Sequence, residues 1–142
     1  MSGFITDDGA KYMLGLFAAS EELLDTYYIS LITGMAPGIS IFGSELEEPD
    51  AASYARATYE NTSGNWQIVN GVLSNTYEIN FPMPTEEWGF LRYWALCEAP
   101  SEGRVFFVGD LPLSVPVVNE AIFFPPGGLT TEFSLANWSA LT

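Results

Sequence analysis

The chain has 142 residues, 48% of them hydrophobic and 15% aromatic, which is enough for one core and excludes an intrinsically disordered chain. Eighteen acidic and four basic residues give a formal net charge of −14, which excludes phosphate-backbone binding to nucleic acid and a polybasic membrane contact. With no histidine and one cysteine, the chain excludes His-based catalysis, His-ligated zinc, multi-cysteine metal sites and intrachain disulfides.

The first predicted element is a short helix over residues 6–20. Its apolar residues recur at helical spacing and are expected to form the buried stripe: Ala10, Met13, Leu14 and Phe17. Thr6 and the two aspartates after it supply an N-cap oxygen and negative charge at the positive end of the helix dipole. Gly9 and Gly15 lower the helix propensity by about 1 kcal/mol each. The helix therefore needs a partner surface.

From Thr26 onward the sequence reads as strands rich in β-branched and aromatic residues. The predicted strands cover residues 26–33, 54–60, 66–69, 73–81, 90–97, 104–109, 118–124 and 129–135. Asn70-Gly71 predicts a tight hairpin, and the 90–97 and 104–109 strands are expected to pair as another. Residues 136–142 form a C-terminal extension. The fold prediction is mainly β: a single-domain antiparallel β-sandwich over residues 1–142, with about seven or eight strands and one short N-terminal helix.

The long connection between Gly34 and Ser53 contains an acidic run: Glu45, Glu47, Glu48 and Asp50. Calcium takes about six to eight oxygen ligands, which clustered carboxylates supply, but the spacing of a calcium-binding loop motif is absent. A solvated acidic loop is the favoured interpretation. A cation or partner site is the alternative.

No segment of the chain has the pattern of an enzyme site. There is no nucleophile elbow and no S-x-x-K motif. Paired carboxylates can hydrolyse glycosides, but nothing in the spacing singles out one pair among eighteen acids. We therefore predict a non-enzymatic protein with no catalytic, cofactor-binding or metal-binding residues. No apolar run approaches the ~20 residues of a membrane helix, and the N-terminus lacks the pattern of a secretory signal.

Four tryptophans are candidate anchors for an interface. Trp94 lies inside an apolar run and is predicted to be core. Trp66 and Trp88 border turns, and both a core and an interface role stay open for them. Trp138 lies in the C-terminal extension and is expected to dock on its own sheet or on a neighbouring subunit.

Two arginines lie within predicted strands of a chain that has few basic residues. A bidentate pair with a carboxylate is the expected role of each. A pair inside the chain is the favoured interpretation, and a pair between subunits is the alternative. With the tryptophans, the candidate interface residues are Trp66, Trp88, Trp138, Arg56 and Arg92.

Short motifs follow one another in a specific order between residues 3 and 133. They read TYYISLIT at 26–33, SYAR at 53–56, INFP at 79–82, EWG at 87–89, YWAL at 93–96, RVFFVGDL at 104–111 and FPPGGL at 124–129. In order and spacing the chain resembles a family of small tailed-bacteriophage structural proteins, commonly labelled tail fibre proteins. It departs from the family pattern at 90–93 and 97–98 and in the added residues 134–142.

The resemblance implies a virion component present in many copies and held by protein–protein contacts. The predicted function is a multimeric tail or tail-fibre-associated subunit, whose partners are other virion proteins and copies of itself. A capsid decoration protein on the outer shell is one alternative. A receptor module that binds a host surface glycan through Trp66, Trp88 or Trp138 is the other. Assembly in the host cytoplasm agrees with the absence of a secretory signal and of disulfides.

Overall fold

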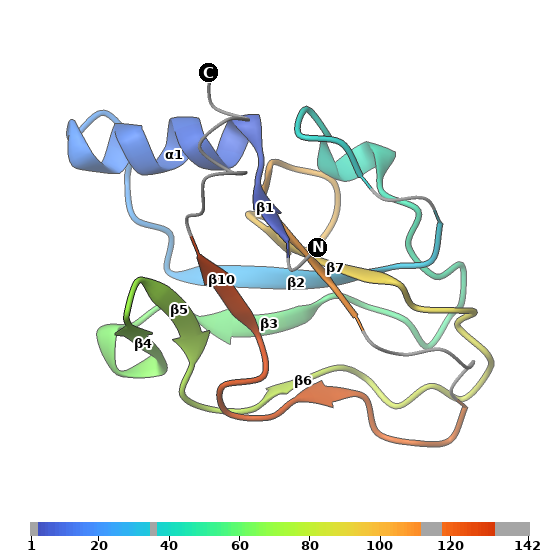
Figure 1. Ribbon diagram of the computed structural model, residues 1–142. Coiled ribbons are helices and arrows are strands. Elements are labelled where there is room, and N and C mark those ends of the chain that lie inside the picture. The colour runs from blue at the N-terminus through green and yellow to red at the C-terminus, as the bar shows by residue number, and fades with distance from the viewer. Residues whose placement is uncertain (1–2, 35–36, 112–117, 133–142) are drawn as a thin grey trace.

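The largest element of the computed structural model is a five-stranded antiparallel sheet in the order β1-β8-β7-β2-β3 (Figure 1). Its strands are β1 (Phe4–Ile5), β2 (Thr26–Ile32), β3 (Ala57–Glu60), β7 (Tyr93–Cys97) and β8 (Val105–Asp110). The structure describes residues 3–34, 37–111 and 118–132. β7 and β8 pair as the predicted hairpin, with a bulge after Leu96.

Two smaller antiparallel sheets complete the described part of the chain, in the order β10-β5-β4 and β6-β9. Their strands are β4 (Trp66–Val69), β5 (Val72–Asn75), β6 (Ile79–Asn80), β9 (Phe123–Phe124) and β10 (Thr130–Glu132). The helices are α1 (Asp7–Phe17) and the 3-10 turns η1 (Gly43–Glu45) and η2 (Ser63–Asn65). The prediction of a mainly β, antiparallel fold with one helix near the N-terminus is confirmed. The described residues form ten strands, several of them only two residues long.

The helix α1 packs on β8 through a face that contains only part of the predicted stripe: Ala10 and Met13 are half-buried against the core. Leu14 is 70% exposed and Phe17 is 95% exposed, so the prediction that they belong to the buried stripe is wrong. The buried positions are Gly9, Tyr12 and Gly15. A Cβ atom on Gly9 would lie 2.0 Å from the carbonyl oxygen of Phe106. Because glycine has no side chain there, the helix backbone can approach β8 directly, and this close approach selects the buried face.

The start of α1 is fixed by Thr6, which is fully buried. Its Oγ1 accepts a hydrogen bond from the Gly9 amide at 2.9 Å, and its hydroxyl contacts the carbonyl oxygens of Val105 and Phe106. The predicted N-cap is confirmed. The helix ends at Phe17, before the predicted end at residue 20.

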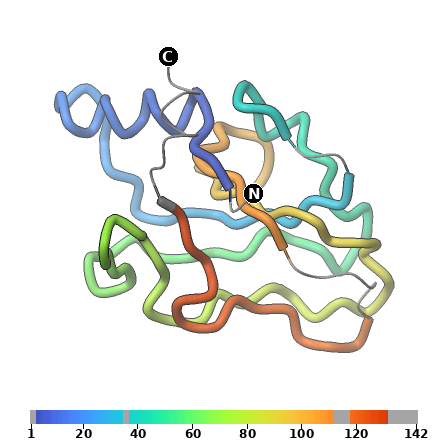
Figure 2. Tube along the Cα trace, viewed as in Figure 1, coloured from blue at the N-terminus to red at the C-terminus, as the bar shows by residue number. Residues whose placement is uncertain are grey.

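The core lies on both faces of the five-stranded sheet. On one face, Ile29, Leu31 and Trp94 pack with residues of the smaller sheets such as Ile79 and Phe124. Ile41 and Leu46 of the 37–50 segment (cyan in Figure 2) cover a second cluster on the other face. This cluster consists of Phe4, Ile32, Ala95, Cys97, Val105 and Val108. Burial on two faces explains the nearly continuous apolar run of β7.

The segment predicted as one strand over residues 73–81 is two strands in different sheets. Asn75 ends the first of them, and its buried side chain makes three hydrogen bonds to the backbone. Its Nδ2 donates to the carbonyl oxygens of Tyr77 at 2.7 Å and Pro125 at 3.0 Å, and its Oδ1 accepts from the Leu129 amide at 2.9 Å. The chain bends after Asn75, and the Tyr77 side chain is exposed.

The remaining strand predictions differ mainly in length. Asn70 and Gly71 have φ of 52° and 79° and close the predicted β4–β5 hairpin. The strand predicted over 118–124 is confined to β9, and the one over 129–135 is described only as β10. The predicted extension 136–142 lies outside the described residues. No helix in the described ranges has the length and apolar character to cross a membrane.

Candidate interaction surfaces

Arg56, immediately before β3, is the centre of a buried ionic network. Its guanidinium pairs with the Glu48 carboxylate through two hydrogen bonds of 2.9 and 3.0 Å. It also donates to the carbonyl oxygens of Ala99 at 2.8 Å and Glu102 at 2.9 Å. Burial opposes the charge, but the Glu48 hydrogen bonds and negative charge outweigh it and raise the pKa of Arg56. The predicted bidentate pair is therefore inside the chain.

The acidic run is divided among different tasks. Glu48 pairs with Arg56, whereas the Glu45 carboxylate accepts from the Phe42 amide at 3.0 Å and caps η1. Glu47 and Asp50 are exposed. Across residues 3–34, 37–111 and 118–132, no group of three or more acidic or cysteine side chains is placed to hold a metal ion.

Trp88 is buried in the same network as Arg56. It is 3% exposed, its Nε1 donates to Ser53 Oγ at 2.9 Å, and its ring meets Tyr54 edge-to-face at a centroid distance of 5.1 Å. The Tyr54 hydroxyl donates to Glu48 at 2.7 Å and accepts from the Leu31 amide at 3.0 Å. Burial and then the charge of Glu48 raise the pKa of Tyr54. Trp88 and Arg56, which were predicted as interface residues, therefore stabilise the fold of their own chain.

Trp66 and Trp94 lie in separate aromatic clusters. Trp66 is half-buried, packs edge-to-face on Tyr59 at 4.9 Å, and donates through Nε1 to Asn61 at 3.0 Å. Trp94 is core, as predicted, and its indole covers Gly109 of β8. Trp138 lies outside the described residues.

Arg92 has an exposed side chain, whereas its backbone bonds to both neighbouring segments. Its amide donates to the Ile32 carbonyl at 2.8 Å, and its carbonyl accepts from the Leu111 amide at 2.9 Å. Among the described residues, no carboxylate lies within ion-pair distance of its guanidinium. Arg92 is therefore a basic group presented on the surface of a strongly acidic chain.

Arg104 forms a second ionic cluster that the sequence did not reveal. It pairs with Glu98 and Glu21 at 3.1 Å each, and its guanidinium lies 5.6 Å from the Tyr12 ring centroid and 5.4 Å from that of Phe106. Glu21 is 83 residues away in the chain. Only the fold brings the two together, so no spacing rule could have paired them.

Cys97 is fully buried against Arg56 and Ser30, and burial raises its pKa to about 11. We expect the folded protein to react with a thiol reagent at pH 8 only as fast as it unfolds, because the reactive thiolate is nearly absent. Since the folded pKa lies above the unfolded one, the folded state holds the proton more tightly. The stability from this group is complete below pH about 9 and is lost as the pH rises towards 11.

The pH dependence is measured by denaturant unfolding at several pH values for the natural chain and for Cys97→Ala. The variant should show a flatter decline of the unfolding free energy between pH 9 and 11. Rapid labelling of the folded natural chain at pH 8, well above its unfolding rate, would contradict the expectation.

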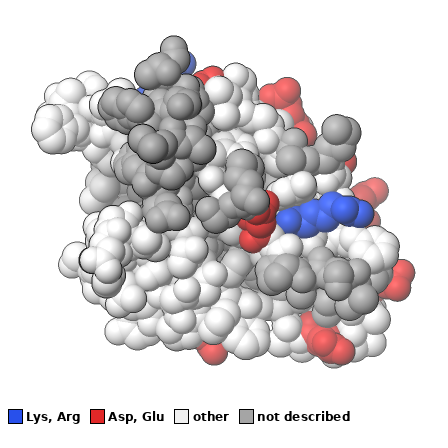
Figure 3. Space-filling model, in the orientation of Figure 1, with Lys and Arg blue, Asp and Glu red and all other residues white. Residues whose placement is uncertain are grey.

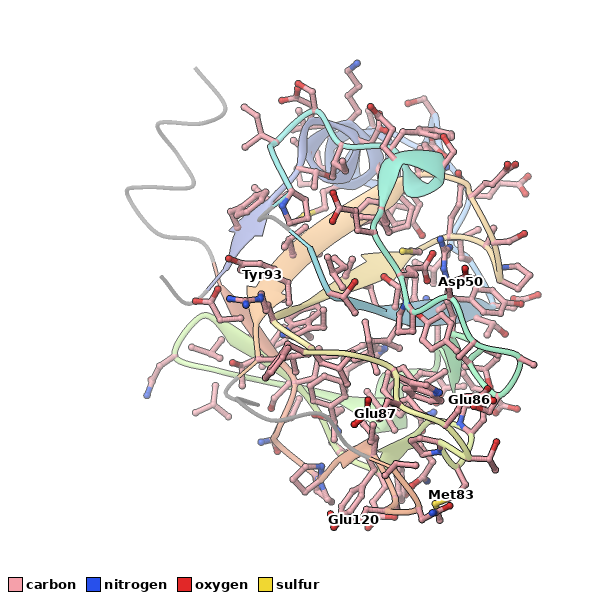
Figure 4. All side chains as sticks on the ribbon, turned by 90° about the vertical axis from the view of Figure 1, so that its right-hand side faces the viewer. Asp50, Met83, Glu86, Glu87, Tyr93 and Glu120 are labelled. Carbon is pink, nitrogen blue, oxygen red and sulfur yellow. The ribbon has the colours of Figure 1, made fainter. Side chains whose placement is uncertain are left out.

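The charges are distributed unevenly over the surface. Figure 4 shows the labelled carboxylates Asp50, Glu86, Glu87 and Glu120 on one side of the molecule, and all four are exposed. We name this the acidic side. Hydrogen bonds from the Ser53 backbone and hydroxyl hold the Glu86 carboxylate there and lower its pKa.

Exposed apolar side chains lie at two other places on the surface, on α1 and on β4, which together we call the uncharged side. Its members are Leu14 and Phe17 of α1 and Ile68 and Val69 of β4, all exposed. In Figure 3 the left-hand part of the visible face is white from the end of α1 down to the β4–β5 hairpin. The described residues that the sequence predicted for an interface do not form one surface. Leu14 and Phe17, which are exposed here, were predicted from their helical spacing to lie in the core.

The chain matches the model of a known family over most of its length. A family model described as "Podophage GP4 fiber I protein gp80" matches residues 18–132, which covers every described strand except β1 and begins just after α1. The resemblance to phage tail fibre proteins is confirmed by this match. No curated protein matches the chain.

Proposed function

The chain belongs to the podophage fiber I protein family, and from this membership we propose that it is a non-enzymatic fibre subunit that forms a homo-multimer on the virion. Membership makes it a phage fibre structural protein that associates with other virion proteins. The family match over residues 18–132 carries the proposal. Assembly takes place in the host cytoplasm.

The exposed apolar side chains favour the multimer. Soluble monomers rarely present large contiguous apolar patches, and such patches mark contacts with other molecules. Phe17 is 95% exposed at the end of α1, and Ile68 is 73% exposed on β4. Of the predicted interface residues, Arg92 and the half-buried Trp66 keep surface that a neighbouring subunit can contact.

Location in the tail is favoured over the two alternatives. The family description names a fibre, which argues against a capsid decoration protein. The tryptophans proposed for a glycan platform give it little support among the described residues, because Trp88 is buried and Trp66 is half-buried with its ring packed on Tyr59, whereas Trp138 lies outside the described residues. The three proposals differ in the location of the subunit on the virion and in glycan binding, so measurements of these two properties together separate them.

Purified virions in which the subunit carries a small C-terminal tag are labelled and imaged, and the label is located in a three-dimensional map. We expect it at the tail, in several symmetry-related copies. Label at the junctions between capsid hexamers would replace the fibre proposal with a decoration role. A glycan array probed with the purified protein serves as the parallel test, and specific retention there would favour the receptor module.

A further inference from the structure

The outer edge of β4 is a strand edge without the usual protection. β4 pairs regularly with β5, from Trp66 opposite Asn75 to Val69 opposite Val72, and no described strand lies on its other side. Natural edge strands are commonly protected by lysine, proline or a bulge. β4 reads Trp-Gln-Ile-Val, which contains neither residue, and its pairing has no register shift.

The register also shows which backbone groups of β4 lack a partner in the sheet. The two-residue turn Asn70-Gly71 makes Val69 and Val72 a hydrogen-bonded pair. Hydrogen-bonded pairs alternate along an antiparallel ladder, and the Thr76 amide bond to the Asn65 carbonyl at 2.9 Å fits the same alternation. The N–H and C=O of Ile68 therefore point away from β5, at an edge where its side chain is also exposed.

Charge limits what can approach this edge. Each copy carries −14, so two copies repel each other wherever their carboxylates face. Residues 61–77, which include all of β4 and β5, contain no charged residue. The hairpin is thus a place where a second acidic chain can make close contact without placing like charges opposite each other.

We propose that a second copy of this chain docks on the uncharged side by pairing its own β4 antiparallel with the β4 of the first copy. The inference rests on the proposed multimer and identifies the contact that builds it. A two-fold axis relates two edge strands in antiparallel orientation, so two three-stranded sheets become one of six strands. Ile68 of each copy supplies both the outward backbone groups and an apolar contact.

The experiment combines sedimentation velocity with residue-resolved amide hydrogen exchange on the full chain over a range of concentrations. The Ile68 amide should become protected as concentration rises, because no described backbone group of the same copy accepts from it. Association should strengthen between about 0.05 and 0.5 M salt, because salt screens the repulsion between acidic copies. An association held by attraction between acidic and basic surfaces would weaken as the salt concentration rises.

Ile68→Lys should shift the dimer midpoint at least tenfold to higher concentration, whereas Met83→Lys, which makes the same charge change at a 49% exposed site outside β4, should leave it unchanged. Ile68→Pro is the second variant, because proline is tolerated on an edge whose N–H faces solvent and would block the pairing. A multimer that forms normally in both Ile68 variants would overturn this inference and leave the multimer standing. A natural chain that stays monomeric at every concentration and salt would overturn both, without affecting the virion location.

Discussion

Replacing Arg56 by alanine should lower the free energy of unfolding by about 3–5 kcal/mol, the typical cost of removing one partner of a buried ion pair. Arg56 immediately precedes β3, and its guanidinium joins that strand to two other segments: the acidic run through Glu48, and the β7–β8 turn through the Ala99 and Glu102 carbonyls. Its loss removes the guanidinium donor from the two carbonyl oxygens and leaves the Glu48 carboxylate without its counter-charge, with the Tyr54 hydroxyl as its remaining described side-chain donor. Urea unfolding followed by tryptophan fluorescence measures the effect.

Arg104→Ala is the matched control for this prediction. Arg104 pairs with two carboxylates where Arg56 pairs with one, but its side chain is 27% exposed, whereas that of Arg56 is 2% exposed. Exposed ion pairs contribute roughly 0–1 kcal/mol, and the contacts with the Tyr12 and Phe106 rings add about another 0.5–1 kcal/mol. Arg56→Lys should recover part of the loss by keeping the charge without the planar fork. Equal losses in Arg56→Ala and Arg104→Ala would show that burial does not set the strength of the pair.

The Arg56 pair also shows how far the sequence leads. A strand-embedded arginine among eighteen acids predicts a bidentate carboxylate partner, and the structure has one in Glu48. The sequence around Arg56 is therefore enough to predict that it pairs with a carboxylate. Its partner was not identifiable, because the choice depends on how the 37–50 segment folds over the sheet. The same limit applies to Trp88: because it lies beside a turn, the sequence did not decide between a core role and an interface role.

The helix shows where periodicity itself misleads. Apolar spacing assigned Leu14 and Phe17 to the core, but the close approach of Gly9 to the Phe106 carbonyl turns that face outward. Hydrophobicity patterns weigh side chains and give no weight to glycine, although a glycine face permits the closest packing. The error bears on function, since the misassigned residues form part of the uncharged side. Apolar residues kept out of a protein's own core are the ones available to its partners.

Truncating Trp94 to alanine should lower the free energy of unfolding by about 3–5 kcal/mol, because it removes a buried aromatic ring from the core. Gly109 lies directly beneath that ring. A Cβ atom at residue 109 would be 2.2 Å from the indole, so Gly109→Ala forces the two apart and should cost about 1–3 kcal/mol in the natural chain.

A double-mutant cycle tests whether the two residues act as one unit. In the Trp94→Ala background the clash is gone, and alanine restricts the unfolded chain more than glycine does. Gly109→Ala should then be neutral or should stabilise by up to about 1 kcal/mol. The coupling between the two sites is therefore expected to be about 1–4 kcal/mol, measured by denaturant unfolding of all four proteins. Additive losses would mean that Gly109 is needed for the conformation of the β8 backbone and not to make room for the Trp94 indole.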